Sequence, residues 1–191
     1  MGADNQQERP GRIASYYITG FVDGEGCFSV TIQRSRNVRL GIQIIPEFHV
    51  SQHQNRTEVL LEIKRAFGCG YIKPNDPGNP KDLTSVYVVR KINDLRSKVI
   101  PFFKKFPIIS TKRLDFKKFA QVVVMMENGK HLEKDGLVKI LKLAFSMNFS
   151  GKYRKLKLVD VLSSLESSET IRQTLQRRRR YSPNCIAICR G

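Results

Sequence analysis

The chain has 191 residues, and its 34 Lys+Arg against 17 Asp+Glu give a formal net charge of +17 and a pI near 10.0. This excess of positive charge favours a polyanionic partner, most commonly nucleic acid. The length suits one domain with an appendage; no apolar run reaches the roughly 18 residues of a membrane span, and four cysteines without paired spacing indicate neither a zinc site nor a disulfide framework.

Residues 1–12 are polar and include Pro10 and Gly11, which is typical of a flexible arm. The segment from Tyr17 to Gly26 then joins a helix-like stretch to a carboxylate. Its apolar residues recur at helical spacing, and two small residues leave a strip where another backbone can come close. The apolar residues are Ile18, Phe21 and Val22, and the small ones are Thr19 and Gly20.

Glu25 stands between Gly24 and Gly26, two residues that can turn sharply. Such a bracket exposes the Glu25 carboxylate and the Gly24 carbonyl, which are hard oxygen ligands suited to Mg²⁺. An ordinary helix that stops at a glycine explains the same residues equally well.

Alternation of apolar and polar residues predicts two hairpins. The first joins a strand at Phe28–Gln33 to a return strand at Leu40–Gln52 through a polar loop. The second joins Tyr71–Lys73 to Ser85–Arg90 through a loop with three prolines.

A capping box at Asn55 and Glu58 predicts the start of a helix that ends at Gly68 and Gly70. Its apolar stripe consists of Val59, Leu60, Ile63 and Phe67. Three further helices are predicted at about residues 94–105, with an interruption near Pro101, and at about 112–128 and 133–147. Phenylalanines at helical spacing in these helices are expected in the core: Phe102, Phe103, Phe106, Phe116 and Phe119.

This order of elements predicts an α+β domain with a four-stranded antiparallel sheet over residues 13–150. Residues 151–191 form a basic extension with ten Lys/Arg and three Asp/Glu, ending in the Arg177–Arg180 cluster and a tail with Cys185 and Cys189. Two amphipathic helices are expected in it, carried by Leu156, Val159, Leu162, Ile171 and Leu175. The extension either contacts DNA phosphates or is a solvated tail.

The segment Tyr17–Gly26 resembles the signature of the LAGLIDADG homing endonucleases. The motif's positions are filled by Gly20, Phe21, Asp23, Gly24, Glu25 and Gly26. The predicted elements also resemble that family's α-β-β-α-β-β-α fold, in which helices cover one face of the sheet and DNA binds the other. Because the motif occurs once, the resemblance implies a homodimer whose motif helices pack together through Thr19 and Gly20.

The resemblance also implies the catalytic residues. Glu25 and the Gly24 carbonyl would hold Mg²⁺, with Mn²⁺ as a substitute and Ca²⁺ as an ion that binds without supporting cleavage; Asp23 is the rival ligand. Gln52 would order the attacking water, with Arg56 four residues on, and Lys112, or its neighbour Arg113, would polarise water or offset phosphate charge. Each of these has a plain alternative as a surface residue.

Base recognition is expected on the polar face of the sheet, because a two-stranded ribbon fits the DNA major groove. The first hairpin offers Ser29, Thr31, Gln33, Arg34, Arg36, Arg39, Gln43, Glu47 and His49, and the second offers Lys73, Asn75, Thr84 and Arg90. Alternation places three apolar residues on the same face, where they can meet thymine methyls: Ile45, Val86 and Val88. His53 could contact a phosphate or have a plain loop role.

The expected function is a homodimeric, Mg²⁺-dependent DNA endonuclease that cuts a long, near-palindromic site across the minor groove and leaves short 3′ overhangs. The resemblance implies an intron-encoded protein of a chloroplast or mitochondrion. Two alternatives use the same fold: a maturase that holds intron RNA, and a noncatalytic DNA-binding regulator.

Overall fold

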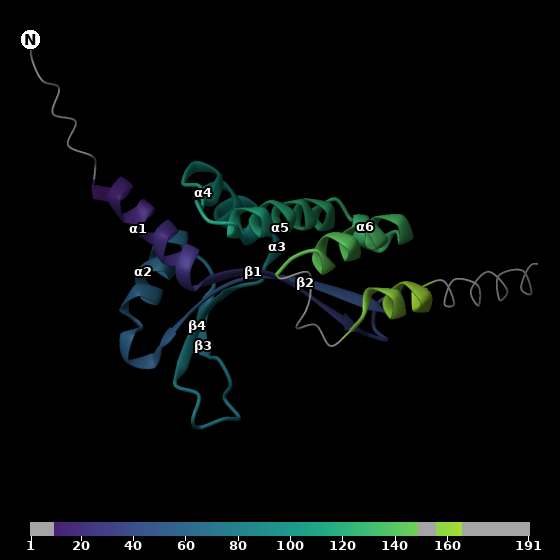
Figure 1. The fold of residues 1–191 in the computed structure, drawn as a ribbon, viewed down its shortest axis with the longest axis horizontal. Helices are drawn as coiled ribbons and strands as arrows, with labels where there is room; N and C mark the ends of the chain where they lie inside the picture. The colour runs from purple at the N-terminus through teal and green to yellow at the C-terminus, as the bar shows by residue number, and fades with distance from the viewer. Residues whose placement is uncertain (1–9, 149–155, 166–191) are drawn as a thin grey trace, which may run out of the picture.

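The computed structural model describes residues 10–148 and 156–165. The described residues contain a four-stranded antiparallel sheet with the strand order β1-β2-β4-β3, as predicted. The sheet is curved, and helices lie over its convex side (Figure 1). Its strands are β1 (Gly26–Arg34), β2 (Ile42–His53), β3 (Tyr71–Pro74) and β4 (Thr84–Val89).

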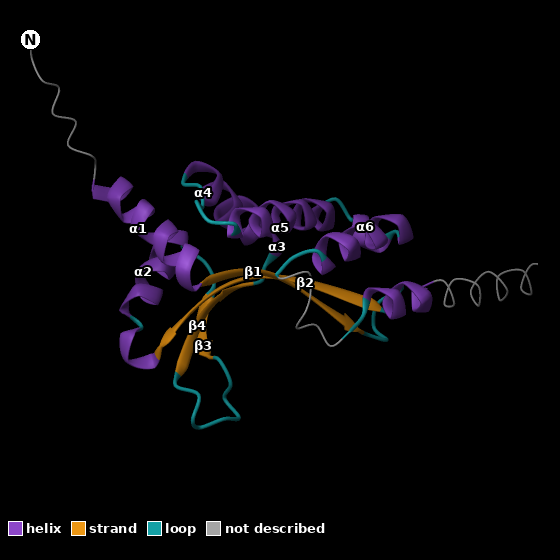
Figure 2. Cartoon of the chain, viewed as in Figure 1, coloured by secondary structure: helices purple, strands orange, loops and turns teal. Residues whose placement is uncertain are grey.

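The helices lie close to their predicted positions, and α5 and α6 both pack on β1 (Figure 2). They are α1 (Pro10–Glu25), α2 (Glu58–Phe67), α3 (Ile92–Asp94), α4 (Ile100–Lys105), α5 (Lys112–Glu127) and α6 (Lys134–Phe145), with the 3-10 turns η1 (Gln54–Arg56) and η3 (Lys130–Leu132) and the π turn η2 (Leu95–Val99). None of the described helices combines the length and the apolar character needed to cross a membrane.

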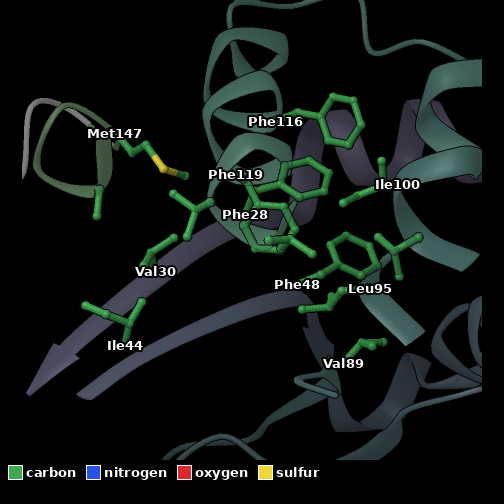
Figure 3. Packing of buried hydrophobic residues seen from close by; sticks show 14 of the residues in the cluster. Phe28, Val30, Ile44, Phe48, Val89, Leu95, Ile100, Phe116, Phe119 and Met147 are labelled. Carbon is green, nitrogen blue, oxygen red and sulfur yellow. The ribbon is translucent and has the colours of Figure 1, made fainter. Parts of the chain in front are cut away.

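An aromatic core joins the sheet to the helices, as the phenylalanine spacing predicts. Phe28 of β1 pairs with Phe48 of β2, and both are buried. The Phe28 ring centroid lies 5.1 to 5.4 Å from four other rings, within the range of favourable aromatic pairs. These rings belong to Phe103 and to Phe48, Phe116 and Phe119, of which the last three are labelled in Figure 3. The core therefore fixes the helix-covered face and leaves the other face of the sheet open.

The predicted capping box at Asn55 is wrong. Asn55 lies in the turn η1, where its backbone N–H donates to Nδ1 of His53 at 3.2 Å. Helix α2 begins three residues later at Glu58, and Thr57 occupies the cap position without a side-chain hydrogen bond. The end of the helix is as predicted, because Gly68 takes the left-handed conformation with φ of 58°.

Pro101 does not interrupt its helix. The chain stays helical from Ile92 to Lys105, and the N–H of Ile100 donates to the carbonyl of Leu95, five residues back. Pro101 follows in the first turn of α4, where a missing N–H is tolerated. The proline therefore coincides with a wider helical turn instead of a break.

The two ends of the chain differ from the expected boundaries. Residues 10–12, expected in the arm, belong to α1. Residues 158–165 form a helix that adds Val161 and Leu165 to the main core, whereas Val159 is 71% exposed, so the predicted apolar face is wrong at that position. The second expected helix, the Arg177–Arg180 cluster and the cysteine tail lie outside the described residues.

Candidate functional site

Glu25 is the last residue of α1, and β1 begins at the next residue. A Cβ on Gly26 would lie 2.6 Å from Cγ1 of Val22 and 2.7 Å from its carbonyl oxygen. Gly26 has no positive φ, so close packing, and not the sharp turn suggested by the sequence, requires a glycine there. This packing places the Glu25 carboxylate directly before the first residue of β1.

The structure distinguishes the two rival carboxylates. Asp23 accepts hydrogen bonds from the backbone N–H of Ser110, at 3.1 Å, and from the Ser110 hydroxyl. Partial burial acts to raise the pKa of Asp23, but the bonds from Ser110 and the charge of Lys112 outweigh it and lower the pKa. Glu25 is exposed and makes no hydrogen bond or ion pair with the described residues. Asp23 is therefore committed to holding the fold, while Glu25 is available to a ligand.

Lys112 joins the start of α5 to the end of α1. Its Nζ donates to three carbonyl oxygens, of Val22 at 2.9 Å, Asp23 at 2.7 Å and Gly24 at 3.3 Å. Desolvation lowers the pKa of this half-buried ammonium, and the charge of nearby acidic groups opposes the effect. Lys112 thus caps the helix that carries Glu25, whereas its neighbour Arg113 lines a groove between α4 and α5.

Sequence reasoning missed Ser110, whose hydroxyl also accepts from the N–H of Lys112 at 3.1 Å. A serine just before a helix was the available signal.

Gln52 and Arg56 lie together beside α1. Both line a hollow of about 740 Å³ whose other side is formed by α1 residues, including Tyr17 and Phe21. Oε1 of Gln52 accepts from the backbone N–H of His53 at 2.8 Å, so this amide is turned toward its own strand. Glu25 is not among the residues that line the hollow.

Of the two small residues of α1, Gly20 lies on the exposed side of the helix and Thr19 does not. Thr19 is only 5% exposed, and its hydroxyl donates to the carbonyls of Ser15 and Phe106, so its predicted place in a dimer interface is wrong. Gly20 is exposed, and a Cβ there would meet no atom within 4 Å. Tyr17, one turn earlier, is 62% exposed. Tyr17, Gly20 and Gly24 therefore form one exposed side of α1.

Strand pairing places most of the predicted recognition residues on the open face. Gln33 pairs with Gln43, and Ser29 pairs with Glu47. These pairs lie on the face of the sheet opposite to that of the buried Phe28–Phe48 pair. The predicted parity is correct for Ser29, Thr31, Gln33, Gln43, Ile45, Glu47, His49, Lys73, Thr84, Val86 and Val88. Val86 and Val88 are nevertheless buried, at 5% and 1% exposed, so neighbouring side chains cover them where contact with thymine methyls was predicted. Three residues that were not predicted share this face: Cys27, Ser51 and Tyr71.

Two predicted recognition residues lie elsewhere. Arg34 pairs with the buried Ile42, so it projects from the helix-covered side of the sheet. The guanidinium of Arg39 donates to the carbonyl of Leu132 in η3, because the hairpin loop packs against the connection between α5 and α6. Arg36 is exposed in the same loop, and Asn75 donates to Asp82 at 2.7 Å in the second hairpin.

An ion-pair network crosses the open face. One carboxylate oxygen of Glu47 pairs with Nε of Arg90, and the other lies 2.9 Å from Nδ1 of His49. Burial acts to lower the pKa of His49, but the Cys27 thiol and the Glu47 carboxylate outweigh it and raise the pKa to about 9. Burial likewise acts to raise the pKa of Glu47, but His49 and Arg90 lower it. The face thus holds two cationic donors around one anion.

The fold and the site define a protein with an available acid at the root of an open polar sheet. A model of the LAGLIDADG endonuclease family matches residues 18–123, and the chain belongs to that family.

One relative and two solved structures illustrate the similarity. The chain is 36% identical over 121 residues to an uncharacterized 50.9 kDa protein in ND4 intron 1 of Podospora anserina; the match covers 62% of this chain and 26% of that protein. The chain thus spans about a quarter of that relative's length.

Two solved structures share the fold. The archaeal intron-encoded homing endonuclease I-Vdi141I, complexed with DNA, is 36% identical with a TM-score of 0.75, over 84% of this chain and 99% of that one. The protein I-SmaMI, bound to an uncleaved DNA target in the presence of calcium ions, is 29% identical with a TM-score of 0.65, over 70% of this chain and 44% of that one.

Proposed function

We propose that this chain is a homodimeric, metal-dependent DNA endonuclease that cuts both strands of a long, near-palindromic site. The observation that carries the proposal is the direct succession of Glu25 and β1. An acid available for hydrolysis is joined, through Gly26 alone, to a strand whose open face carries hydrogen-bonding side chains.

DNA as the substrate is supported by charge and by family. The net charge of +17 suits the phosphate backbone, and the open face offers both donors and acceptors, which base reading requires. The relative I-Vdi141I was solved in complex with DNA.

The proposed metal is Mg²⁺. The described residues contain no group of three or more His, Cys, Asp or Glu suited to a metal ion, so one chain offers the Glu25 carboxylate and the Gly24 carbonyl, both hard oxygens. These two groups fit a cation that shares its remaining ligands with DNA phosphates, water and a second subunit. Such an ion would stabilise charge on the phosphate and activate water.

The second subunit would supply the second acid. Each DNA strand needs its own hydrolytic group, and one chain presents one available carboxylate at the end of α1. The exposed surface of Tyr17, Gly20 and Gly24 allows two copies of α1 to approach closely, because no side chain stands on either glycine. Within this dimer Gln52 and Arg56 would lie beside the interface, and in each subunit Lys112 would hold the C-terminal end of α1.

The proposed genetic setting is an organellar intron. The relative in ND4 intron 1 of Podospora anserina is intron-encoded by its description, and this chain shares 36% identity with it.

The test is cleavage of a plasmid that carries the candidate intron-insertion sequence, with Mg²⁺ and separately with Ca²⁺. We expect a double-strand break with Mg²⁺, and binding without a break with Ca²⁺. Glu25→Gln should lower the cleavage rate by on the order of 100-fold or more, as loss of a charge-stabilising catalytic group does elsewhere. Glu133→Gln is the matched control, because that carboxylate is exposed in an ion pair with Lys130, away from α1.

No Mg²⁺-dependent break by the wild-type protein would reject the enzyme. Normal cleavage by Glu25→Gln would reject the assignment of the acid. One chain per cognate duplex, measured by sedimentation, would reject the dimer.

A further inference from the structure

We infer that Glu47 is a positioning residue whose ion pairs hold Arg90 and His49 in place, and that the N–H groups of these two side chains read guanine close to the cut. The inference rests on the proposed function and names part of its DNA site.

The exposed fractions of Glu47, Arg90 and His49 indicate which side chain positions the others and which can contact DNA. The Glu47 side chain is 15% exposed, and each of its carboxylate oxygens faces a cation. Arg90 is 49% exposed and His49 is 26% exposed. The anion is therefore covered by its partners, and the donors are the groups that an approaching DNA edge meets.

The network also joins separate strands. Glu47 and His49 belong to β2, while Arg90 follows the end of β4, so their ion pairs cross the sheet. The other polar groups around the pair are Cys27 opposite His49 and Tyr71 near Arg90. A half-buried carboxylate is unfavourable on a surface that receives a polyanion unless cations neutralise it. Its presence is explained if it fixes the direction of two donors, since held side chains lose less entropy on binding.

The register gives the distance from the cut. His49 pairs with Cys27, two residues beyond Glu25, and Glu47 pairs with Ser29, four residues beyond. At about 3.3 Å per residue these positions lie about 7 and 13 Å from the acid, which correspond to about two and four base pairs of B-DNA. The pair Gln33–Gln43, whose side chains bond at 2.8 Å, lies eight residues beyond Glu25 and so about eight base pairs out.

The chemistry of the donors selects the base. A guanidinium matches O6 and N7 of guanine, which are both acceptors in the major groove. His49 is protonated near neutral pH, because its pKa is raised to about 9, and its second ring nitrogen can donate to one such acceptor of a neighbouring guanine. We therefore assign guanine to the positions about two to four base pairs from each cut.

The experiment measures Ca²⁺-supported binding and Mg²⁺-supported cleavage on the wild-type target, selected from a randomised DNA pool, and on single-base-pair variants of it. The wild-type protein should prefer guanine over other bases at the inner positions by about 5- to 150-fold, the discrimination of one bidentate contact. Glu47→Gln should reduce this preference several-fold without weakening binding to DNA of unrelated sequence. Gln43→Ala is the matched variant, and it should change discrimination only near the eighth base pair.

Arg90→Gln provides a second route if Glu47→Gln unfolds, as judged by thermal melting, and it too should lose inner discrimination alone. Unchanged inner discrimination in both variants, or an equal loss at inner and outer positions, would overturn the inference. If the wild-type protein binds its selected DNA but does not cut it, the nuclease proposal is rejected. The base preference measured in binding would still test whether Arg90 recognises guanine.

Discussion

The Nζ of Lys112 lies 2.7 Å from the carbonyl oxygen of Asp23, at the end of the helix that carries Glu25. A cation at the C-terminus of a helix interacts favourably with its unpaired carbonyls. The Lys112 ammonium, which is proposed to act on phosphate or water, therefore also fixes the position of Glu25 by holding the end of α1.

We expect Lys112→Met to lower the free energy of unfolding by about 1.5–3 kcal/mol, the usual value for hydrogen bonds to a charged group. Cleavage should fall further than this loss explains, because the end of α1 is released. Denaturant unfolding and cleavage kinetics measure the two effects. Lys117→Met, on the exposed side of α5, should alter neither, and equal behaviour of the two variants would contradict the role of Lys112.

Ser110→Ala should destabilise the protein by about 1 kcal/mol at neutral pH, because Asp23 loses its side-chain donor. The pKa of Asp23 is lowered in the fold, so its contribution to stability is present above its unfolded pKa and is lost as the pH falls through the folded value. The difference between variant and wild type should therefore shrink in acid below about pH 4. Chemical unfolding at several pH values measures it, and a constant difference would argue against the Asp23 bond.

Gly24 and Gly26, the two glycines on either side of Glu25, should respond differently to alanine. Gly26→Ala should cost about 1–3 kcal/mol or more through overpacking, because its Cβ would collide with Val22. Gly24→Ala should leave the monomer's stability nearly unchanged, since no atom lies within 4 Å of its Cβ. Thermal melting of both variants distinguishes close packing from any general need for glycine around Glu25.

Protonation of His49 should stabilise the fold. Its pKa is raised from 6.5 to about 9, so its contribution is fully present below pH 6.5 and is lost as the pH rises through 9. The shift corresponds to about 3 kcal/mol. NMR titration should give the raised pKa, and Glu47→Gln should lower it. His49→Gln should lack this part of the pH dependence of unfolding; an unshifted His49 titration would contradict the ion pair.

Gly20→Leu should prevent the proposed dimer without unfolding the chain, because the added side chain stands on the exposed side of α1 and leucine favours helix. Sedimentation should give the mass of one chain, and cleavage should be lost while melting is retained. Thr19→Val tests the opposite side of the helix: it removes internal hydrogen bonds and should lower stability without altering the subunit count of the folded protein.

Periodicity was sufficient for the sheet but not for the details of the site. Alternation in β1 and β2 follows from one face being buried, so the parity of Ser29 and His49 could be predicted from local sequence. The roles of Thr19 and Asp23 could not, because their partners, Phe106 and Ser110, are 87 residues away in the chain. The capping box at Asn55 was a wrong prediction because the backbone N–H of Asn55 bonds to His53 within the turn η1. Local patterns thus predicted faces, and long-range hydrogen bonds decided which polar residues remain available.

The close packing of Gly26 on Val22 fixes the start of β1 directly after Glu25. Positions along β1 can therefore be counted as distances from this acid. Each open-face side chain of β1 lies a fixed number of residues from the acid, whatever its chemical identity. Substitution of Thr31 or Gln33 can therefore change which DNA sequence is accepted without moving the point of the cut. In the proposed nuclease, the target can change one base pair at a time while the position of cleavage is inherited unchanged.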